Sequence, residues 1–279
     1  RLAITFIACL GTAACTSQAQ SHKTDMVNGA ISSPIQLPSL APKTEIKTEV
    51  KTPSWQAQTP TPMPAPGTLY ATRPEVMTFA NELAGRHNLD AQWVRQMMGQ
   101  ARFNPTVSRL MRPPTKTFIK NWRVYRSRFI DPVRIAAGVR FWQANQTTLA
   151  RAEKEYGVPA EILVGIIGVE TIYGRDTGNF RVMDALMTLA FDFPPSHPNA
   201  LARSAYFRSE VEQFLVLNNK HKTNPLEVKG SYAGAMGWPQ FMPSSWLHYA
   251  VDFDGDGKID LWNSPADIIG SVANYFKAY

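Results

Sequence analysis

The segment PAEILVGIIGVETIYG, residues 159–174, constrains the fold more than any other part of this sequence. Apolar side chains and glycines occupy almost every side of the helix that it would form, which is the pattern of a helix buried all round. Proline is well tolerated in the first turn of a helix, so Pro159 suits its start. We therefore predict a buried central helix that begins at Pro159.

Helical patterns also dominate the sequence around this segment. A long amphipathic helix is expected over residues 131–157, because Asp131 and Pro132 suit its start and Gly157 its end. Asp90 is a suitable N-cap for another helix. Apolar residues recur at helical spacing in residues 74–88, 90–101, 184–191, 199–218 and 265–279.

The remaining segments add little regular structure. Residues 107–131 contain the pair Pro113 and Pro114 and are expected to form an ordered surface loop. Alternating apolar and polar residues are scarce, so strands should be few and short. The predicted fold class is mainly α.

Composition divides the chain into three parts. Residues 1–15 have a basic start, a short apolar run and small residues before Cys15, which predicts an export signal. The sequence GTAAC resembles the lipobox of bacterial lipoproteins, and an ordinary cleaved signal is the alternative. Residues 16–68 hold eight of the 21 prolines and few apolar residues, so we expect a disordered tether. Residues 69–279 form the predicted folded domain.

The side-chain inventory excludes several kinds of site. The formal charge is +7, but lysine and arginine are spread along the chain and form no recognisable nucleic-acid module. Cys9 and Cys15 are the only cysteines, so the folded domain has neither a disulfide framework nor a thiolate metal site. The five histidines show no close metal-ligand spacing. The positive charge remains compatible with an acidic polymer such as a cell-wall glycan.

Glu170 is the outstanding residue of the central helix, because it follows a run of glycine and aliphatic side chains. A buried carboxylate needs a partner, and Arg175 or Arg181 could supply one if Glu170 is structural. An apolar setting is also what keeps a catalytic carboxyl protonated near neutral pH, as a glycosidase requires. Gly165 and Gly168 would then allow a sugar or another backbone to come close. The segment alone leaves both readings open.

Three motifs occur in order along the chain. They are YGVPAEILVGIIGVETIYGR at 156–175, KGSYAGAMGWPQFMPSSW at 229–246, and DFDGDGKIDLW with IGSVANYF between 252 and 276. Together they resemble the lytic murein transglycosylases of the B type, which are bacterial peptidoglycan-cleaving enzymes. The resemblance implies a lysozyme-like catalytic core from about Leu69 to the end of the chain. It also implies that such a domain continues beyond residue 279.

The resemblance assigns to Glu170 the part of sole catalytic acid and base. It would protonate the glycosidic oxygen between N-acetylmuramic acid and N-acetylglucosamine, and then accept the proton of the muramoyl 6-hydroxyl as a 1,6-anhydro ring closes. One carboxyl suffices because the nucleophile belongs to the substrate, whereas hydrolases use two. The other acids nearby are expected to be solvated-face or capping residues; they are Asp184, Asp192, Glu210 and Glu212.

Further residues match substrate-facing positions of the family. They are Gln240, Ser231, Tyr275, Tyr125 and Arg203. Gln240 could instead bond backbone in a glycine-rich turn, and either tyrosine could belong to the core. Trp238 and Pro239 stand where the family commonly has a Tyr-Gly pair, so an aromatic residue is kept.

The sequence DFDGDGKID has the spacing of an EF-hand loop, with Asp252, Asp254 and Asp256 at positions 1, 3 and 5. Alternate carboxylates in such a loop converge on one hard cation. The resemblance implies that Lys258 adds its backbone carbonyl and that Asp267 closes the site. We therefore expect a structural calcium ion rather than a catalytic one; an acidic surface turn is the alternative.

These observations predict an exported lytic transglycosylase that acts on peptidoglycan glycan strands. Cys15 would carry a lipid that anchors it to the periplasmic face of the outer membrane, and a soluble periplasmic enzyme is the alternative. A muramidase that uses water is the nearest rival function. A catalytically inactive, calcium-dependent cell-wall binding protein is the rival from another class.

Overall fold

The computed structural model describes residues 63–114 and 121–279. The predicted export signal, nearly all of the predicted tether, and Cys15 lie outside the described residues. Among the described helices, none is both long and apolar enough to cross a membrane.

The elements of the first half are η2 Tyr70–Thr72, α1 Pro74–His87, α2 Ala91–Gly99, α3 Pro105–Leu110, α4 Trp122–Arg126, α5 Pro132–Ala144, α6 Gln146–Tyr156 and α7 Ala160–Thr171. Those of the second half are β1 Phe180–Arg181, α8 Val182–Phe191, α9 Ala200–His221, β2 Lys229–Gly230, α10 Pro243–Tyr249 and α11 Pro265–Lys277. The mainly α prediction is confirmed, and the strands in the described part of the chain are two residues long.

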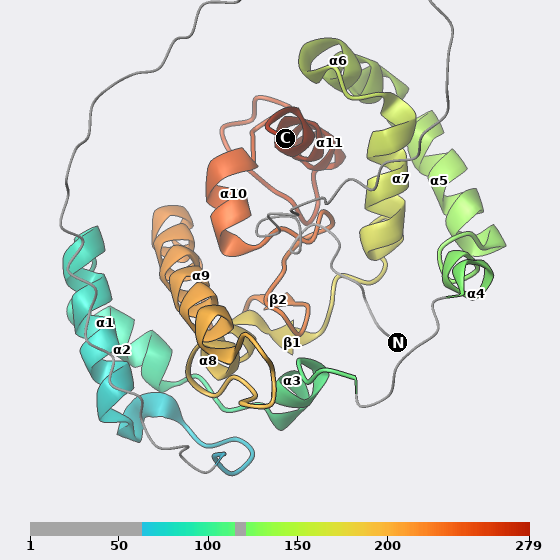
Figure 1. Cartoon of the computed structure of the whole chain (residues 1–279). Helices are drawn as coiled ribbons and strands as arrows, with labels where there is room; N and C mark the ends of the chain where they lie inside the picture. The colour runs from blue at the N-terminus through green and yellow to red at the C-terminus, as the bar shows by residue number, and fades with distance from the viewer. Residues whose placement is uncertain (1–62, 115–120) are drawn as a thin grey trace, which may run out of the picture. The chain divides into compact units, whose positions relative to one another are not determined.

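Two groups of helices lie on either side of the chain segment between β2 and α10, and α1 and α2 pack together apart from them (Figure 1). In one group, α5, α6 and α7 contact one another, and α11 contacts both α6 and α7. In the other, α9 packs along α8 and also contacts α10, which in turn contacts α11. The helix α11 therefore joins the two groups, next to the central helix α7.

Several helix ends lie where the sequence predicts them. The side chain of Asp90 accepts the Trp93 N–H at the start of α2, and Asp131 accepts the Arg134 N–H at the start of α5. Gly157 ends α6 in the left-handed conformation, with φ of 76°. These caps are local interactions, which is why the sequence reveals them.

The predicted long helix 131–157 is wrong, because it is two helices that meet at Asn145. The Asn145 side chain donates to the Phe141 carbonyl at 2.8 Å, and its own φ of −122° leaves the helical region. Asparagine competes in this way with the helical hydrogen bonds of the backbone. The predicted loop 107–131 also needs correction, since it includes most of α3 and all of α4.

The central helix α7 follows Pro159 directly, as predicted, and buries Leu163 and Ile167 in the core. It is not buried all round, because Ile162 is 47% exposed and Gly165 also faces solvent. Burial among the described residues therefore does not explain why apolar residues lie on nearly every side of α7.

Candidate active site

Glu170 is the last residue but one of α7 and is only 8% exposed. Of the two arginines considered as structural partners, Arg181 donates to Asp184 at 2.6 Å and to the Gln100 carbonyl at 3.1 Å. The charge of Arg181 is therefore already paired with another carboxylate. Glu170 thus combines burial with a position at the very end of a largely apolar helix.

The backbone turns sharply just after Glu170. Ile172, Tyr173 and Gly174 all have positive φ, of 52°, 55° and 79°. The left-handed region costs a residue with a side chain about 1–2 kcal/mol, and the β-branched Ile172 is especially unsuited to it. Such strain persists only where surrounding contacts impose it, and it is concentrated at functional sites.

Thr171 supplies two of the contacts that impose this turn. Its hydroxyl accepts the Gly174 N–H at 3.1 Å and donates to the Trp238 carbonyl at 3.0 Å. The indole of Trp238 lies directly on Gly174, where an added Cβ would come within 2.1 Å of the ring. Gly174 is therefore required both by its φ and by the space that Trp238 fills. These contacts hold the end of α7 against the segment 230–241.

A short antiparallel ladder continues this link. β1 pairs with β2, with Phe180 opposite Gly230 and Arg181 opposite Lys229. Just before β1, Gly178 lies so close to the Gly230 carbonyl that a Cβ would approach it within 2.2 Å. Gly178 thus lets the backbone before β1 lie directly against the backbone of Gly230.

Ser231 and Gln240 lie buried in the segment 230–241. The Ser231 hydroxyl accepts the N–H groups of Ala233 and Ala235, which closes the turn. The Gln240 amide donates to the carbonyls of Thr177 and Gly237, at 3.1 and 3.0 Å. The backbone-bonding alternative considered for Gln240 is thus present. The substrate contacts of both residues stay predictions.

Tyr275 belongs to the core of the described part of the chain. It is 3% exposed on α11, and its ring packs on Phe241 with centroids 5.4 Å apart. Through Phe241 it supports the segment that carries Gln240. Its predicted contact with substrate stays a prediction.

Tyr125 and Arg203 lie on two other helices, α4 and α9. Tyr125, on α4, is half-buried between Trp122 and Phe129. Arg203 lies in the first turn of α9. The structure thus brings Ser231, Gln240 and Tyr275 together, and the parts of Tyr125 and Arg203 in substrate binding stay predictions.

Two residues that sequence reasoning missed hold α7 against α5. The Arg134 guanidinium donates to the Gly168 carbonyl at 2.8 Å, and the Tyr173 hydroxyl donates to the Val164 carbonyl at 3.1 Å. The Tyr173 hydroxyl occupies the space above Gly168, within 2.5 Å of where a Cβ would be. Gly168 therefore accommodates this side chain rather than a ligand, whereas Gly165 has open space.

One of the other acids is buried and does not face solvent. Glu210 is 2% exposed and accepts both the N–H and the hydroxyl of Ser244 in the first turn of α10. It is a capping residue as predicted, but the cap comes from a distant helix. Burial raises the pKa of Glu210, and the bonds from Ser244 oppose that rise.

The predicted metal loop brings three carboxylates together. One oxygen each from Asp252, Asp254 and Asp256 lies within 4.8 Å of the others. The same carboxylates accept loop N–H groups, including that of Gly257 on Asp252 at 2.8 Å. Three hard oxygen donors in alternate positions, curled around one point, fit a divalent cation such as calcium.

Asp267, predicted to be the last ligand of the metal site, bonds the backbone of the loop in this structure. It is buried, and its carboxylate accepts the N–H groups of Phe253, Asp254 and Asp260. It thus fastens the loop to the first turn of α11 and lies outside the cluster of three carboxylates. Its part as a ligand stays a prediction, as does that of the Lys258 carbonyl.

The family model described as the transglycosylase SLT domain matches residues 71–279. The chain belongs to this transglycosylase family. It is 46% identical over 219 residues to the membrane-bound lytic murein transglycosylase B of Escherichia coli strain K12.

Solved structures of this transglycosylase family agree with the fold. Soluble lytic transglycosylase SltB1 of Pseudomonas aeruginosa is 48% identical, with a TM-score of 0.68 over 74% of this chain and 66% of that one. The E. coli lytic transglycosylase Slt35 in complex with calcium is 46% identical, with a TM-score of 0.68 over 76% of this chain and 65% of that one. The match to transglycosylase B covers 75% of this chain but 58% of the relative. The chain therefore spans less than two thirds of the length of these relatives.

Proposed function

We propose that this chain is a peptidoglycan lytic transglycosylase that cleaves the β-1,4 bond between N-acetylmuramic acid and N-acetylglucosamine. The observation that carries the proposal is Glu170, a buried carboxyl at the end of α7 beside a strained turn. Membership of the transglycosylase family and the name of the E. coli relative support it.

In the proposed reaction Glu170 acts twice. Its carboxyl first donates a proton to the glycosidic oxygen as the bond to the muramoyl anomeric carbon breaks. The resulting carboxylate then takes the proton of the muramoyl 6-hydroxyl, which attacks that carbon and closes a 1,6-anhydro ring. The low exposure of Glu170 shields its carboxyl from bulk water during both proton transfers.

Digestion of purified peptidoglycan tests the proposal. Wild type should release muropeptides with anhydro-muramoyl ends, as read by mass spectrometry, and Glu170→Gln should lose this activity by a factor of about 100 or more. Glu161→Gln is the matched control, because Glu161 is an exposed carboxylate in the first turn of the same helix. Water-added products would instead indicate a muramidase. Unchanged activity in Glu170→Gln would refute the assignment of the acid.

We also propose that the loop of Asp252, Asp254 and Asp256 binds a structural calcium ion. The three converging carboxylates support this, as does the existence of the Slt35 structure in complex with calcium. When bound, the ion would neutralise the mutual repulsion of these carboxylates and steady the loop ahead of α11. It would take no part in the proton transfers of Glu170.

We propose that Cys15 carries a lipid that holds the enzyme at the periplasmic face of the outer membrane, a soluble periplasmic form being the alternative. The lipobox-like GTAAC sequence and the membrane-bound E. coli relative support it. In cells fed a labelled fatty acid, wild type should take up label and fractionate with membranes. Cys15→Ala should do neither, and label on that variant would contradict the proposal.

A further inference from the structure

The last turn of α7 is held by α5 as well as by the segment 230–241. The guanidinium of Arg134, on α5, donates through Nε to the Gly168 carbonyl at 2.8 Å. The same carbonyl accepts the Ile172 N–H at 3.2 Å, which is a bond of the helix end. A carbonyl oxygen has two lone pairs and can accept both donors. Arg134 therefore bonds α7 at the place where the helix ends.

The Arg134 guanidinium is itself held in place by the start of its own helix and the turn before it. Its Nη1 donates to the Asp131 carboxylate at 2.6 Å and to the Arg128 carbonyl at 3.0 Å. Asp131 also accepts the Arg134 N–H, so one carboxylate holds both the start of α5 and the guanidinium. The Arg134 side chain is only 14% exposed. The planar guanidinium thus presents its Nε–H to α7 in a fixed direction.

Glu170 lies between two fixed points of one helical turn. Gly168, two residues before it, is bonded by Arg134. Thr171, directly after it, donates to the Trp238 carbonyl at 3.0 Å. Residues of one helical turn keep their relative positions, so the place of the Glu170 carboxyl depends on both bonds. Precision matters here, because a misplacement of about 1 Å can cost a factor of about 100 in rate.

We propose that Arg134 is a positioning residue for the reaction proposed above, on which this inference rests. It acts through α7 and not on the substrate, by holding the last turn so that the Glu170 carboxyl meets the glycosidic oxygen. Its charge also suits the C-terminal end of a helix, where cations are favoured. The fork of donors is needed as well, because a lysine could not bond all three oxygens in this geometry.

Steady-state kinetics of the whole chain on soluble peptidoglycan glycan strands tests this inference. Arg134→Ala should lower kcat by about tenfold or more and leave KM unchanged, because the acid is misplaced while the groups that bind substrate remain. Arg134→Lys, which keeps the charge, should lie between wild type and Arg134→Ala. Rates are compared where circular dichroism shows each variant to be folded. A raised KM with unchanged kcat would tie Arg134 to substrate binding and overturn the proposal.

Rescue by a small molecule separates the fork of donors from the charge. Methylguanidinium added to Arg134→Ala should restore part of kcat, because it can bond the Gly168 carbonyl from the vacated position. Methylammonium carries the same charge without the planar donors and should restore none. Equal rescue by the two cations, or no rescue by methylguanidinium, would contradict the proposal.

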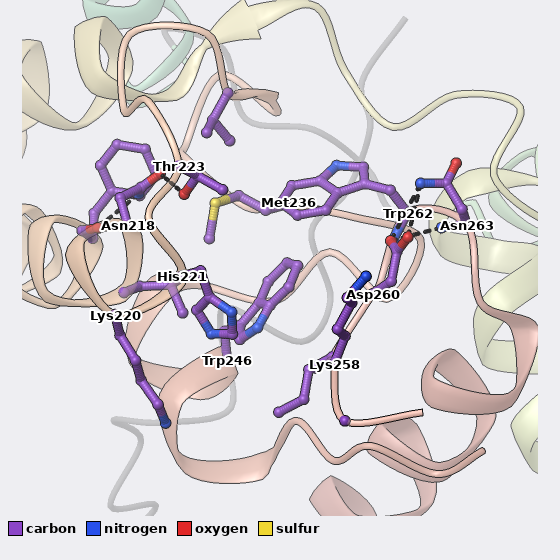
Figure 2. A pocket seen from close by; sticks show the side chains of 15 residues that line it. Asn218, Lys220, His221, Thr223, Met236, Trp246, Lys258, Asp260, Trp262 and Asn263 are labelled. Carbon is purple, nitrogen blue, oxygen red and sulfur yellow. Dashed lines mark hydrogen bonds between the residues drawn. The ribbon is translucent and has the colours of Figure 1, made fainter. Parts of the chain in front are cut away.

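Two matched variants control for the loss of a positive charge. Arg140→Ala removes an exposed arginine of the same helix. Lys220→Ala removes an exposed lysine at the end of α9, beside a cavity of about 610 Å³ whose lining includes no residue of α5 or α7 (Figure 2). Both should keep the wild-type kcat. A fall as large as that of Arg134→Ala in either control would refute the role of the bond to Gly168.

Amide hydrogen exchange supplies a measurement that needs no activity. Arg134→Ala should speed exchange in residues 168–174 and leave exchange in α9 unchanged, because the lost bond belongs to the end of α7. Unchanged exchange in residues 168–174 would refute the positioning role. Faster exchange there, with no anhydro products from wild type, would refute the proposed function and leave the link from Arg134 to α7 standing. Anhydro products with an unchanged kcat in Arg134→Ala would do the reverse.

Discussion

Replacing Thr171 with valine should loosen the turn that follows Glu170. Valine keeps the shape of threonine but lacks the hydroxyl that bonds both the Gly174 N–H and the Trp238 carbonyl. Thr171 is 0% exposed, so water cannot reach the vacated position easily. The change therefore removes the hydrogen bonds while leaving the packing nearly intact.

The magnitude follows from the two backbone groups that lose their partner. Each buried polar group left unpaired costs about 1–3 kcal/mol, and the half-buried Gly174 can regain part of this from water. We expect Thr171→Val to lower the free energy of unfolding by about 2–4 kcal/mol. Domains are typically stable by about 5–15 kcal/mol, so the variant should still fold. Thr171→Ser, which keeps the hydroxyl and loses one methyl group, should cost about 1 kcal/mol.

Urea unfolding followed by circular dichroism measures these differences, and muropeptide release measures their effect on the site. Thr171→Val should lose activity even in conditions where it is fully folded, because Glu170 precedes the loosened turn. The reasoning is refuted if the valine variant is as stable as wild type, or if the serine variant is destabilised as much as the valine variant.

Three further predictions concern other contacts. Gly174→Ala should lower stability by about 2–4 kcal/mol, because it combines left-handed strain with overlap onto Trp238; an unchanged Tm would contradict this. Burial raises the pKa of Glu210, so the native state holds that proton more tightly than the unfolded state does, and the contribution of Glu210 to stability should fall as pH rises above 4.5. Urea unfolding at several pH values should show that Glu210→Gln lacks this pH-dependent contribution. Curves of stability against pH that run parallel in wild type and variant would contradict this. Calcium at about 100 times its Kd should stabilise wild type by about 2.7 kcal/mol but Asp254→Asn much less, and an equal rise in Tm in both would exclude the loop as the site.

Where sequence prediction succeeded, the deciding interactions are local. The caps at Asp90, Asp131 and Gly157 each involve residues three or four positions apart. The break at Asn145 escaped prediction because an asparagine inside an apolar pattern only competes with the helix, and the pattern continues on both sides. The helix α10 was also missed, and its first turn is held by Glu210, which is 34 residues away.

The same distinction between local and distant contacts applies to the candidate site. Glu170 stands out in the sequence because a carboxyl follows an apolar run, and the family resemblance strengthens that reading. The contacts of Thr171 and Arg134 could not be read from spacing, because they join residues that are 67 and 34 positions apart. The signal in the sequence for the first of these contacts was the threonine of the GVET motif. Its identity is explained by the hydrogen-bond partner of its hydroxyl, and not by helix propensity.

The bond between Thr171 and Trp238 also has a consequence for how the chain folds. Contacts between residues so far apart in sequence form late, because the loop between them must close first. Residues 172–174 have local hydrogen bonds, such as that of the Gly174 N–H to Thr171, and the contact with Trp238 adds a distant one. The helix α7 and its local bonds can therefore form before residues 230–241 dock, and we expect the bond to Trp238 to be completed afterwards. On this expectation, the geometry of the candidate site is finished late in folding.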